Sequence, residues 1–76
     1  MTKKSIRIIL GENVKYYRLL NKFTHEKLAE LCNLRARYIS NIENANGNIS
    51  IDTLEKIANT FQMDYLFLIK ENNFNK

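Results

Sequence analysis

The chain has 76 residues, 45% hydrophobic and 26% charged, with a formal net charge of +4 at pH 7, so it has room for one small domain with one core. Its single cysteine excludes an internal disulfide, its single histidine argues against a metal site, and no apolar run is long enough to span a membrane. We therefore expect one cytoplasmic domain over residues 1–76, without cofactor or small-molecule ligand. The absence of proline favours helices, and the basic charge favours a nucleic acid or another anionic partner.

The first predicted helix runs from about residue 6 to about residue 21, after a basic and frayed leader over residues 1–5. Its core-facing positions follow the helical period of about 3.6 residues: Ile6, Leu10, Val14 and Tyr17. Basic residues are denser here than elsewhere, which fits either a solvated face or contacts to phosphate. Lys3 and Lys4 are the candidates for such contacts in the leader.

Two short helices joined by a tight turn are predicted between residues 24 and 44. Thr24 is a suitable N-cap for the first of them. The turn is Cys32-Asn33-Leu34, in which Asn33 tolerates the left-handed backbone that the turn requires. The inward positions of the two helices are Leu28, Ala29, Cys32, Ile39 and Ile42.

The outward face of the second of these helices is polar and carries no acid. Its positions form one stripe: Ala36, Arg37, Ser40, Asn41 and Asn44. Such a surface suits base-pair edges in a major groove, where arginine pairs with guanine and asparagine with adenine. Arg35 cannot accept a backbone N–H, so we expect a helix without a side-chain cap and a base or phosphate contact from Arg35 instead. Tyr38 is expected either to pack beside the helix or to bind a phosphate.

Residues 44–48, N-A-N-G-N, predict a turn between helices, because strand alternation is missing on both sides. Ser50 is predicted to cap a fourth helix that ends near Gln62 and Met63. The buried stripe of this helix is Leu54, Ile57, Ala58 and Phe61. Asp64 is predicted to cap a last short helix over residues 65–70, and the polar tail over residues 71–76 is predicted to be loose.

Four segments, taken in order, carry a family resemblance: L-G-E-N-V-K-Y-Y-R-L-L, F-T-H-E-K-L-A-E, Y-I-S-N-I-E-N and N-I-S-I-D-T-L-E-K-I-A. The chain resembles the helix-turn-helix domain of the phage repressor and Cro family, and within it most closely the controller proteins of restriction–modification systems. The resemblance covers about residues 10–69. It implies an all-α, five-helix, lambda-repressor-like fold that binds double-stranded DNA.

The residue pattern and the resemblance together predict roles for individual residues. The candidates for contacts to bases are Arg35, Ala36, Arg37, Ser40, Asn41 and Asn44. The candidates for contacts to phosphates are Thr24, His25, Tyr38, Asn46, Gly47 and Asn48. Arg18 resembles an arginine that pairs with the glutamate ending the recognition helix, here Glu43, although Arg18 can equally reach a phosphate. His25 stands where the family usually has a phosphate-binding glutamine, and it either keeps that contact or stays exposed and idle.

The last helix is apolar at five consecutive positions, Tyr65 to Ile69, which is more than a helix packed on one face needs. By resemblance, Leu68 points inward, while Leu66 and Phe67 stand where the family often has polar residues. An exposed apolar patch predicts a homodimer built on Tyr65, Leu66, Phe67 and Ile69, unless the helix twists to bury Leu66 and Phe67. Such a dimer spaces two recognition helices one DNA turn apart, roughly 34 Å, on a near-palindromic operator.

These features predict a homodimeric, sequence-specific DNA-binding regulator, most like a restriction–modification controller. The alternatives are a phage-type repressor, an antitoxin regulator, or a protein-interaction module that has lost DNA binding. We do not expect an enzyme, because the sequence offers neither clustered acids nor a metal-ligand set.

Overall fold

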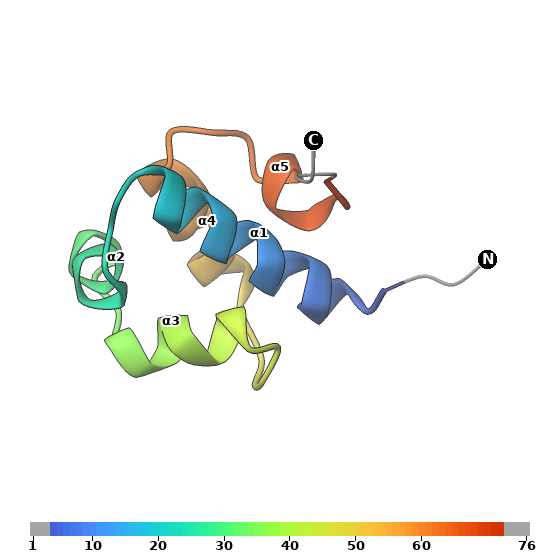
Figure 1. The fold of residues 1–76 in the computed structure, drawn as a ribbon, viewed down its shortest axis with the longest axis horizontal. Coiled ribbons are helices and arrows are strands. Elements are labelled where there is room, and N and C mark those ends of the chain that lie inside the picture. The colour runs from blue at the N-terminus through green and yellow to red at the C-terminus, as the bar shows by residue number, and fades with distance from the viewer. Residues whose placement is uncertain (1–3, 73–76) are drawn as a thin grey trace.

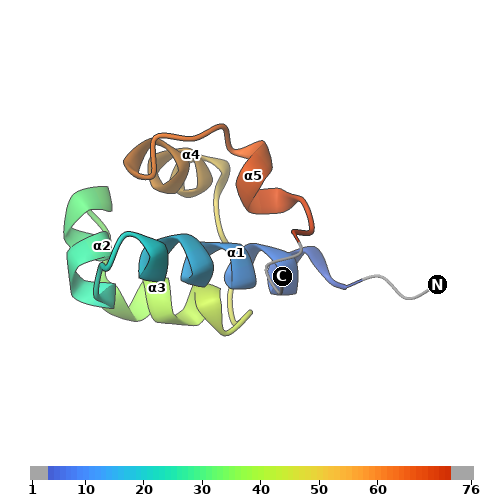
Figure 2. The same ribbon diagram turned by 45° about the horizontal axis from the view of Figure 1, so that its top comes forward.

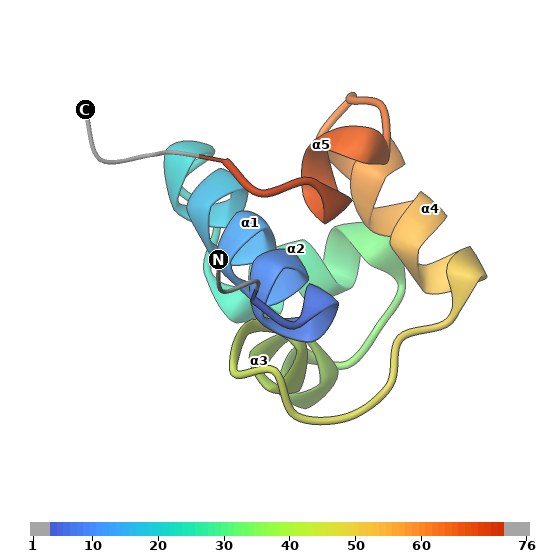
Figure 3. The same cartoon turned by 90° about the vertical axis from the view of Figure 1, so that its right-hand side faces the viewer.

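The computed structural model describes residues 4–72, and the regular elements in this range are five helices. They are α1 (Ile6–Leu20), α2 (His25–Cys32), α3 (Ala36–Glu43), α4 (Ile51–Thr60) and α5 (Leu66–Ile69). Helix α1 lies in the middle, between α3 on one side and α4 and α5 on the other (Figures 1 and 2). A view turned by 90° again shows α3 along one edge, where no other helix covers it (Figure 3). The predicted all-α, five-helix architecture is therefore confirmed.

Side-chain caps begin three of the helices. The hydroxyl of Thr24 accepts from the N–H of Lys27 at 2.9 Å, and the hydroxyl of Ser50 accepts from the N–H of Thr53 at 3.0 Å, as predicted. Ser5 caps α1 in the same way, which the prediction of a frayed leader did not include. Helix α3 begins without a side-chain cap, because Arg35 has no acceptor to offer.

Four helices end through the same left-handed turn. The residues with positive φ are Lys22, Asn33, Ala45 and Gln62, at 57° to 61°. In each case the next residue donates its N–H to a carbonyl five positions back, at 2.8 to 3.0 Å, which is the Schellman pattern. Only Asn33 was predicted from the sequence. The residue after the turn is apolar and half-buried in three cases, Phe23, Leu34 and Met63. In the fourth case it is Asn46, which is polar and exposed.

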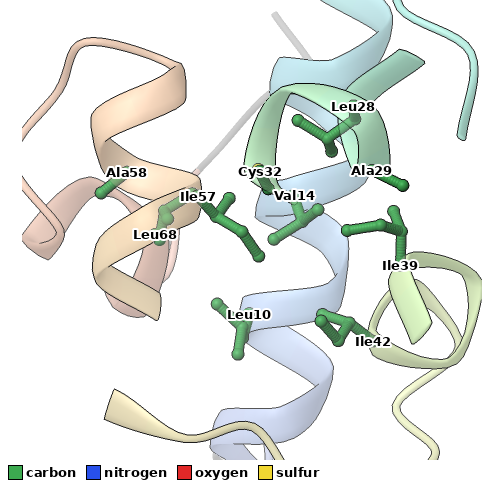
Figure 4. Close-up of a cluster of buried hydrophobic side chains, with 10 residues drawn as sticks. All are labelled: Leu10, Val14, Leu28, Ala29, Cys32, Ile39, Ile42, Ile57, Ala58 and Leu68. Atoms are coloured by element: carbon green, nitrogen blue, oxygen red, sulfur yellow. The ribbon is translucent and has the colours of Figure 1, made fainter. Parts of the chain in front are cut away.

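The core lies between α1 and the other four helices (Figure 4). Its buried members are Leu10, Val14, Leu28, Ala29, Cys32, Ile39, Ile42, Ile57, Ala58 and Leu68. Burial raises the pKa of the Cys32 thiol, so that this side chain stays neutral. The prediction for Ile6 is wrong: it is 60% exposed, because it lies in the first turn of α1, at the end of the bundle. Tyr17, Leu54 and Phe61 are half-buried against this core.

Helix α5 is shorter than the predicted span of residues 65–70 and has four residues. The carboxylate of Asp64 accepts from the N–H of Leu66 at 2.9 Å, as expected for a residue that starts a helix. In the predicted loose tail, Asn72 donates to the side-chain oxygen of Asn13 at 3.0 Å, so the chain is held there. Lys3 and residues 73–76, on which other predictions fall, lie outside the described residues.

Candidate nucleic-acid interface

The exposed face of α3 carries the stripe that the sequence predicted. Arg35, Arg37 and Asn44 are exposed, and Ser40 and Asn41 are half-buried. Arginine and the two amides supply hydrogen-bond donors and acceptors of the kind that read base edges. The remaining predicted base contact, Ala36, is also half-buried and packs partly against the core, so only part of its methyl group is exposed.

A buried charge pair fixes the far end of α3 to α1. Arg18 donates from Nε to Oε2 of Glu43 at 2.6 Å and from Nη2 to Oε1 at 3.2 Å, and the two side chains are 8% and 5% exposed. The third guanidinium nitrogen, Nη1, donates to the carbonyl of Phe23 at 2.9 Å. These contacts commit Arg18 to the protein interior rather than to a phosphate, and the two-point pairing restricts how α3 can turn.

The backbones of α1 and α3 approach each other closely at Gly11. A Cβ on this residue would lie 2.5 Å from the carbonyl oxygen of Ile42 and 2.8 Å from that of Glu43. Any larger side chain would push α3 away from α1, because both neighbours are backbone atoms. Sequence reasoning missed this residue, although a glycine inside a predicted helix is a recognised signal of close packing.

His25 contributes a third contact to the same carboxylate. Its Nε2 lies 3.0 Å from Oε1 of Glu43, and 38% of its side chain remains exposed. The sequence offered two alternatives, a phosphate contact or an idle exposed ring. The structure joins the start of α2 to the end of α3 through this ring, so the ring is not idle. Part of the ring is still exposed, and its contact to a phosphate stays a prediction.

Two segments carry the other predicted phosphate contacts. Thr24, at the start of α2, uses its hydroxyl as the helix cap but remains exposed. After α3, residues 46–48 are all exposed, and the loop forms the turn between helices that was predicted. Gly47 has a φ of +99°, a backbone conformation that other residues rarely adopt, and this conformation accounts for a glycine here. Crowding does not account for it, because a Cβ would meet no atom within 4 Å.

Tyr38 is half-buried, packs against the core, and donates from its hydroxyl to the carbonyl of Asn48 at 3.1 Å. It therefore packs beside the helix, which is one of its two predicted roles.

In the predicted leader, Lys4 pairs with Glu12 at 3.0 Å. The hydrogen bond to Glu12 and its charge raise the pKa of Lys4.

The opposite face of the molecule is apolar. Tyr65, Leu66 and Phe67 are 51%, 53% and 44% exposed, while Leu68 is fully buried. In the described chain, α5 does not twist to bury Leu66 and Phe67. Beside α5 lies a shallow groove lined by Ile51, Leu54, Glu55, Tyr65 and Ile69. Ile51, at 81% exposed, is a member of this face that the sequence analysis did not identify.

Asn13 anchors α5 to α1 and was also missed from the sequence. Its side chain is buried, and its Nδ2 donates to the carbonyls of Leu68 at 2.7 Å and Lys70 at 2.9 Å. An asparagine inside an amphipathic helix gives no sign of a partner more than fifty residues away. The amide satisfies carbonyls that end the short helix.

The described residues 4–72 contain no group of three or more His, Cys, Asp or Glu side chains that could hold a metal ion. None of the helices in the same range has both the length and the apolar character needed to cross a bilayer.

A protein family described as helix-turn-helix matches residues 14–68. The chain is 42% identical over 55 residues to the control protein C.BamHI of Bacillus amyloliquefaciens, a match that covers 71% of this chain and 68% of that protein. It is 41% identical over 53 residues to the control protein C.SmaI of Serratia marcescens, a match that covers 70% of this chain and 63% of that protein. The chain thus spans about two-thirds of the length of these curated relatives.

Among solved structures, the restriction–modification controller C.Esp1396I bound to a 25 base pair operator site is similar to this fold. The TM-score is 0.75 at 32% identity, and the match covers 86% of this chain and 87% of that chain. The sequence match, the shared fold and the exposed polar face of α3 agree with one another. This protein belongs to the helix-turn-helix family, and it is a DNA-binding transcription regulator rather than an enzyme.

Proposed function

We propose that this protein is a restriction–modification controller that binds a near-palindromic operator as a homodimer. The observation that carries the proposal is the exposed polar stripe on α3, a helix whose orientation is fixed by the buried pair of Arg18 and Glu43. A surface that reads bases has to be held in a defined orientation, because hydrogen bonds to base edges are directional. Such a regulator acts in the cytoplasm, where it meets its operator.

The proposed contacts to DNA divide into two groups. Those to base edges come from Arg35, Ala36, Arg37, Ser40, Asn41 and Asn44. Those to phosphates come from Thr24, His25, Asn46, Gly47 and Asn48. Tyr38 is left out of this group, because its single hydroxyl proton is already donated to the carbonyl of Asn48. The phosphate contacts position the protein on the duplex, and the base contacts supply specificity. The start of α2 carries backbone N–H groups and the positive end of a helix dipole, which favours a phosphate beside His25.

The proposed dimer uses the apolar face of α5. Tyr65, Leu66, Phe67 and Ile69 supply its side chains, and the groove beside α5 receives side chains of the second copy. A two-fold axis buries the same patch from both subunits. It also places two α3 helices on one side of the dimer, about one DNA turn apart, roughly 34 Å.

A selection from random duplexes tests the proposed function. We expect one enriched motif with two-fold symmetry, bound at roughly 10⁻⁸ to 10⁻¹¹ M, with much weaker and salt-sensitive binding to other sequences. Failure to enrich any motif would leave the alternative of a protein-interaction module. A methyltransferase gene and an endonuclease gene beside the coding sequence would favour a controller over a phage-type repressor or an antitoxin regulator.

The variant Phe67→Asp tests the dimer. Placing a charge in the proposed interface should leave the fold intact by circular dichroism, give a monomer in sedimentation, and remove most of the operator affinity. Leu31→Asp is the matched control, because Leu31 is similarly exposed, at 47%, but lies on α2. If Phe67→Asp still sediments as a dimer, the interface lies elsewhere on the molecule.

A further inference from the structure

The loop after α3 is held differently from the loops after the other long helices. After α1, α2 and α4, the residue that follows the left-handed turn is apolar and packs against the core. After α3 this residue is Asn46, which is exposed, and the next side chain packed against the core is that of Ile49. Gly47, with a φ of +99°, lies between them. This stretch of backbone therefore depends on polar contacts for its position.

Asn48 makes two such contacts, to two different helices. Its Oδ1 accepts from Nη2 of Arg7, in the first turn of α1, at 2.6 Å. Its backbone carbonyl accepts from the hydroxyl of Tyr38, on α3, at 3.1 Å. The first bond is charge-assisted, and such bonds are shorter and stronger than bonds between neutral groups. Together they join the loop to α1 and to α3.

The chemistry of the guanidinium group determines which way the Asn48 amide faces. Arginine has only donors, so the amide must present its oxygen to Arg7. The NH2 group of Asn48, with its two donors, is then directed away from Arg7. A phosphate accepts hydrogen bonds and cannot donate them when ionised, so an amide in this orientation is prepared to bind a phosphate oxygen.

We propose that Arg7 is a positioning residue for DNA binding: it holds the loop after α3 and orients the Asn48 amide so that its NH2 group donates to a phosphate. This inference rests on the proposed function, in which this loop contacts the DNA backbone. Holding the loop before DNA arrives reduces the ordering that binding would otherwise require. Arg7 then acts through Asn48 and makes no phosphate contact itself.

A double-mutant cycle on operator affinity tests the inference. Arg7→Ala should weaken binding about fivefold in the wild-type background and less than twofold in the Asn48→Ala background, because its effect passes through Asn48. An equal loss in both backgrounds would show that Arg7 contacts DNA independently, and it would overturn the proposal. Lys15→Ala is the matched control, since it removes an exposed cation from the same helix that is not among the proposed DNA contacts. A loss from Lys15→Ala equal to that from Arg7→Ala would show that the effect comes from net charge alone, and it would also overturn the proposal.

The orientation of the amide is tested by Asn48→Asp. A carboxylate keeps the contact to Arg7 but has only acceptors, and its charge repels phosphate. Asn48→Asp should therefore bind operator more weakly than Asn48→Ala, although the loop is still anchored. Binding of Asn48→Asp at the wild-type level would remove the proposed donor role.

A measurement on the free protein separates this inference from the proposed function. By NMR, Arg7→Ala should shift the backbone amide of Gly47 and the side-chain NH2 of Asn48 and speed their hydrogen exchange, while α2 and α4 keep their spectra. Unchanged resonances and exchange in the loop would overturn the inference. If the wild-type protein enriches no operator, the proposed function fails, and this experiment still decides whether Arg7 holds the loop.

Discussion

Helices α3 and α5 carry the two surfaces that we propose bind DNA and a second copy of the chain, and they are held in place in different ways. Helix α3 exposes polar side chains and is fixed to α1 and α2 by a carboxylate, Glu43, that contacts Arg18 on α1 and His25 on α2. Helix α5 has four residues, exposes apolar side chains, and is fixed to α1 by the amide of Asn13 and by Leu68 in the core.

The difference corresponds to what each surface is proposed to bind. Hydrogen bonds to bases depend on direction, so α3 benefits from a two-point charge pair that restricts rotation. Apolar contacts between subunits are less directional, so α5 needs only to be placed beside α1, and a second copy can complete its packing. Each of the following substitutions changes either the attachment of one of these two helices or the surface that it exposes.

The largest expected effect comes from Glu43→Ala. It leaves the guanidinium of Arg18 buried and unpaired, so the free energy of unfolding should fall by about 3–5 kcal/mol in urea denaturation. Glu30→Ala is the matched control, because Glu30 is exposed on α2 and its nearest cation, Lys27, lies 3.9 Å away. That control should change stability by less than about 1 kcal/mol. Equal effects from the two substitutions would show that the buried pair does not hold α3.

On the α5 side, Asn13→Ala removes the donors that satisfy the carbonyls of Leu68 and Lys70. We expect a loss of about 2 kcal/mol, because the buried carbonyl of Leu68 is left unpaired, and faster amide exchange in α5 than in α3. Asn59→Ala, on the exposed side of α4, is the control and should change neither. Uniform exchange over both helices would contradict the separate anchoring of α5.

Arg37 tests the exposed face of α3 itself. Arg37→Ala should cost about 1–3 kcal/mol on the operator and relax the preference at one position in each half-site, because one base, most simply a guanine, loses its partner. Stability should not change, since Arg37 is exposed. Lys56→Ala, an exposed cation on α4, should leave the selected motif intact. Equal losses on operator and random DNA would make Arg37 a phosphate contact.

The sequence predicted the parts of this fold that depend on local pattern. Helical periodicity predicted the buried faces of α2 and α3, and the caps at Thr24 and Ser50 follow from the hydrogen-bonding of hydroxyl side chains. Periodicity failed at Ile6, because a pattern describes a helix face and does not show where neighbouring helices stop covering it.

The contacts that join distant parts of the chain could not be predicted in the same way. Asn13 and Arg7 look like ordinary polar residues of a helix, and their partners lie more than forty positions away. The pair of Arg18 and Glu43 was reached only through the family resemblance, and His25 was expected to face DNA or solvent. Polar pairing of this kind depends on how helices are placed in space, which neither propensity nor period encodes.

The smallest expected effect concerns the exit from α3. Ala45 has a φ of 61°, a left-handed conformation that L-residues other than Asn and Asp rarely adopt and that costs them about 1 kcal/mol relative to glycine. Ala45→Gly should therefore raise the free energy of unfolding by up to about 1 kcal/mol, reduced by the greater freedom of glycine in the unfolded chain. Ala36→Gly, in the first turn of the same helix, is the control and should not stabilise the protein. Thermal unfolding measures both, and a lower melting temperature for Ala45→Gly would mean that the methyl group of Ala45, which lines a small hollow together with Ile42 and Ile49, contributes more than the backbone strain costs.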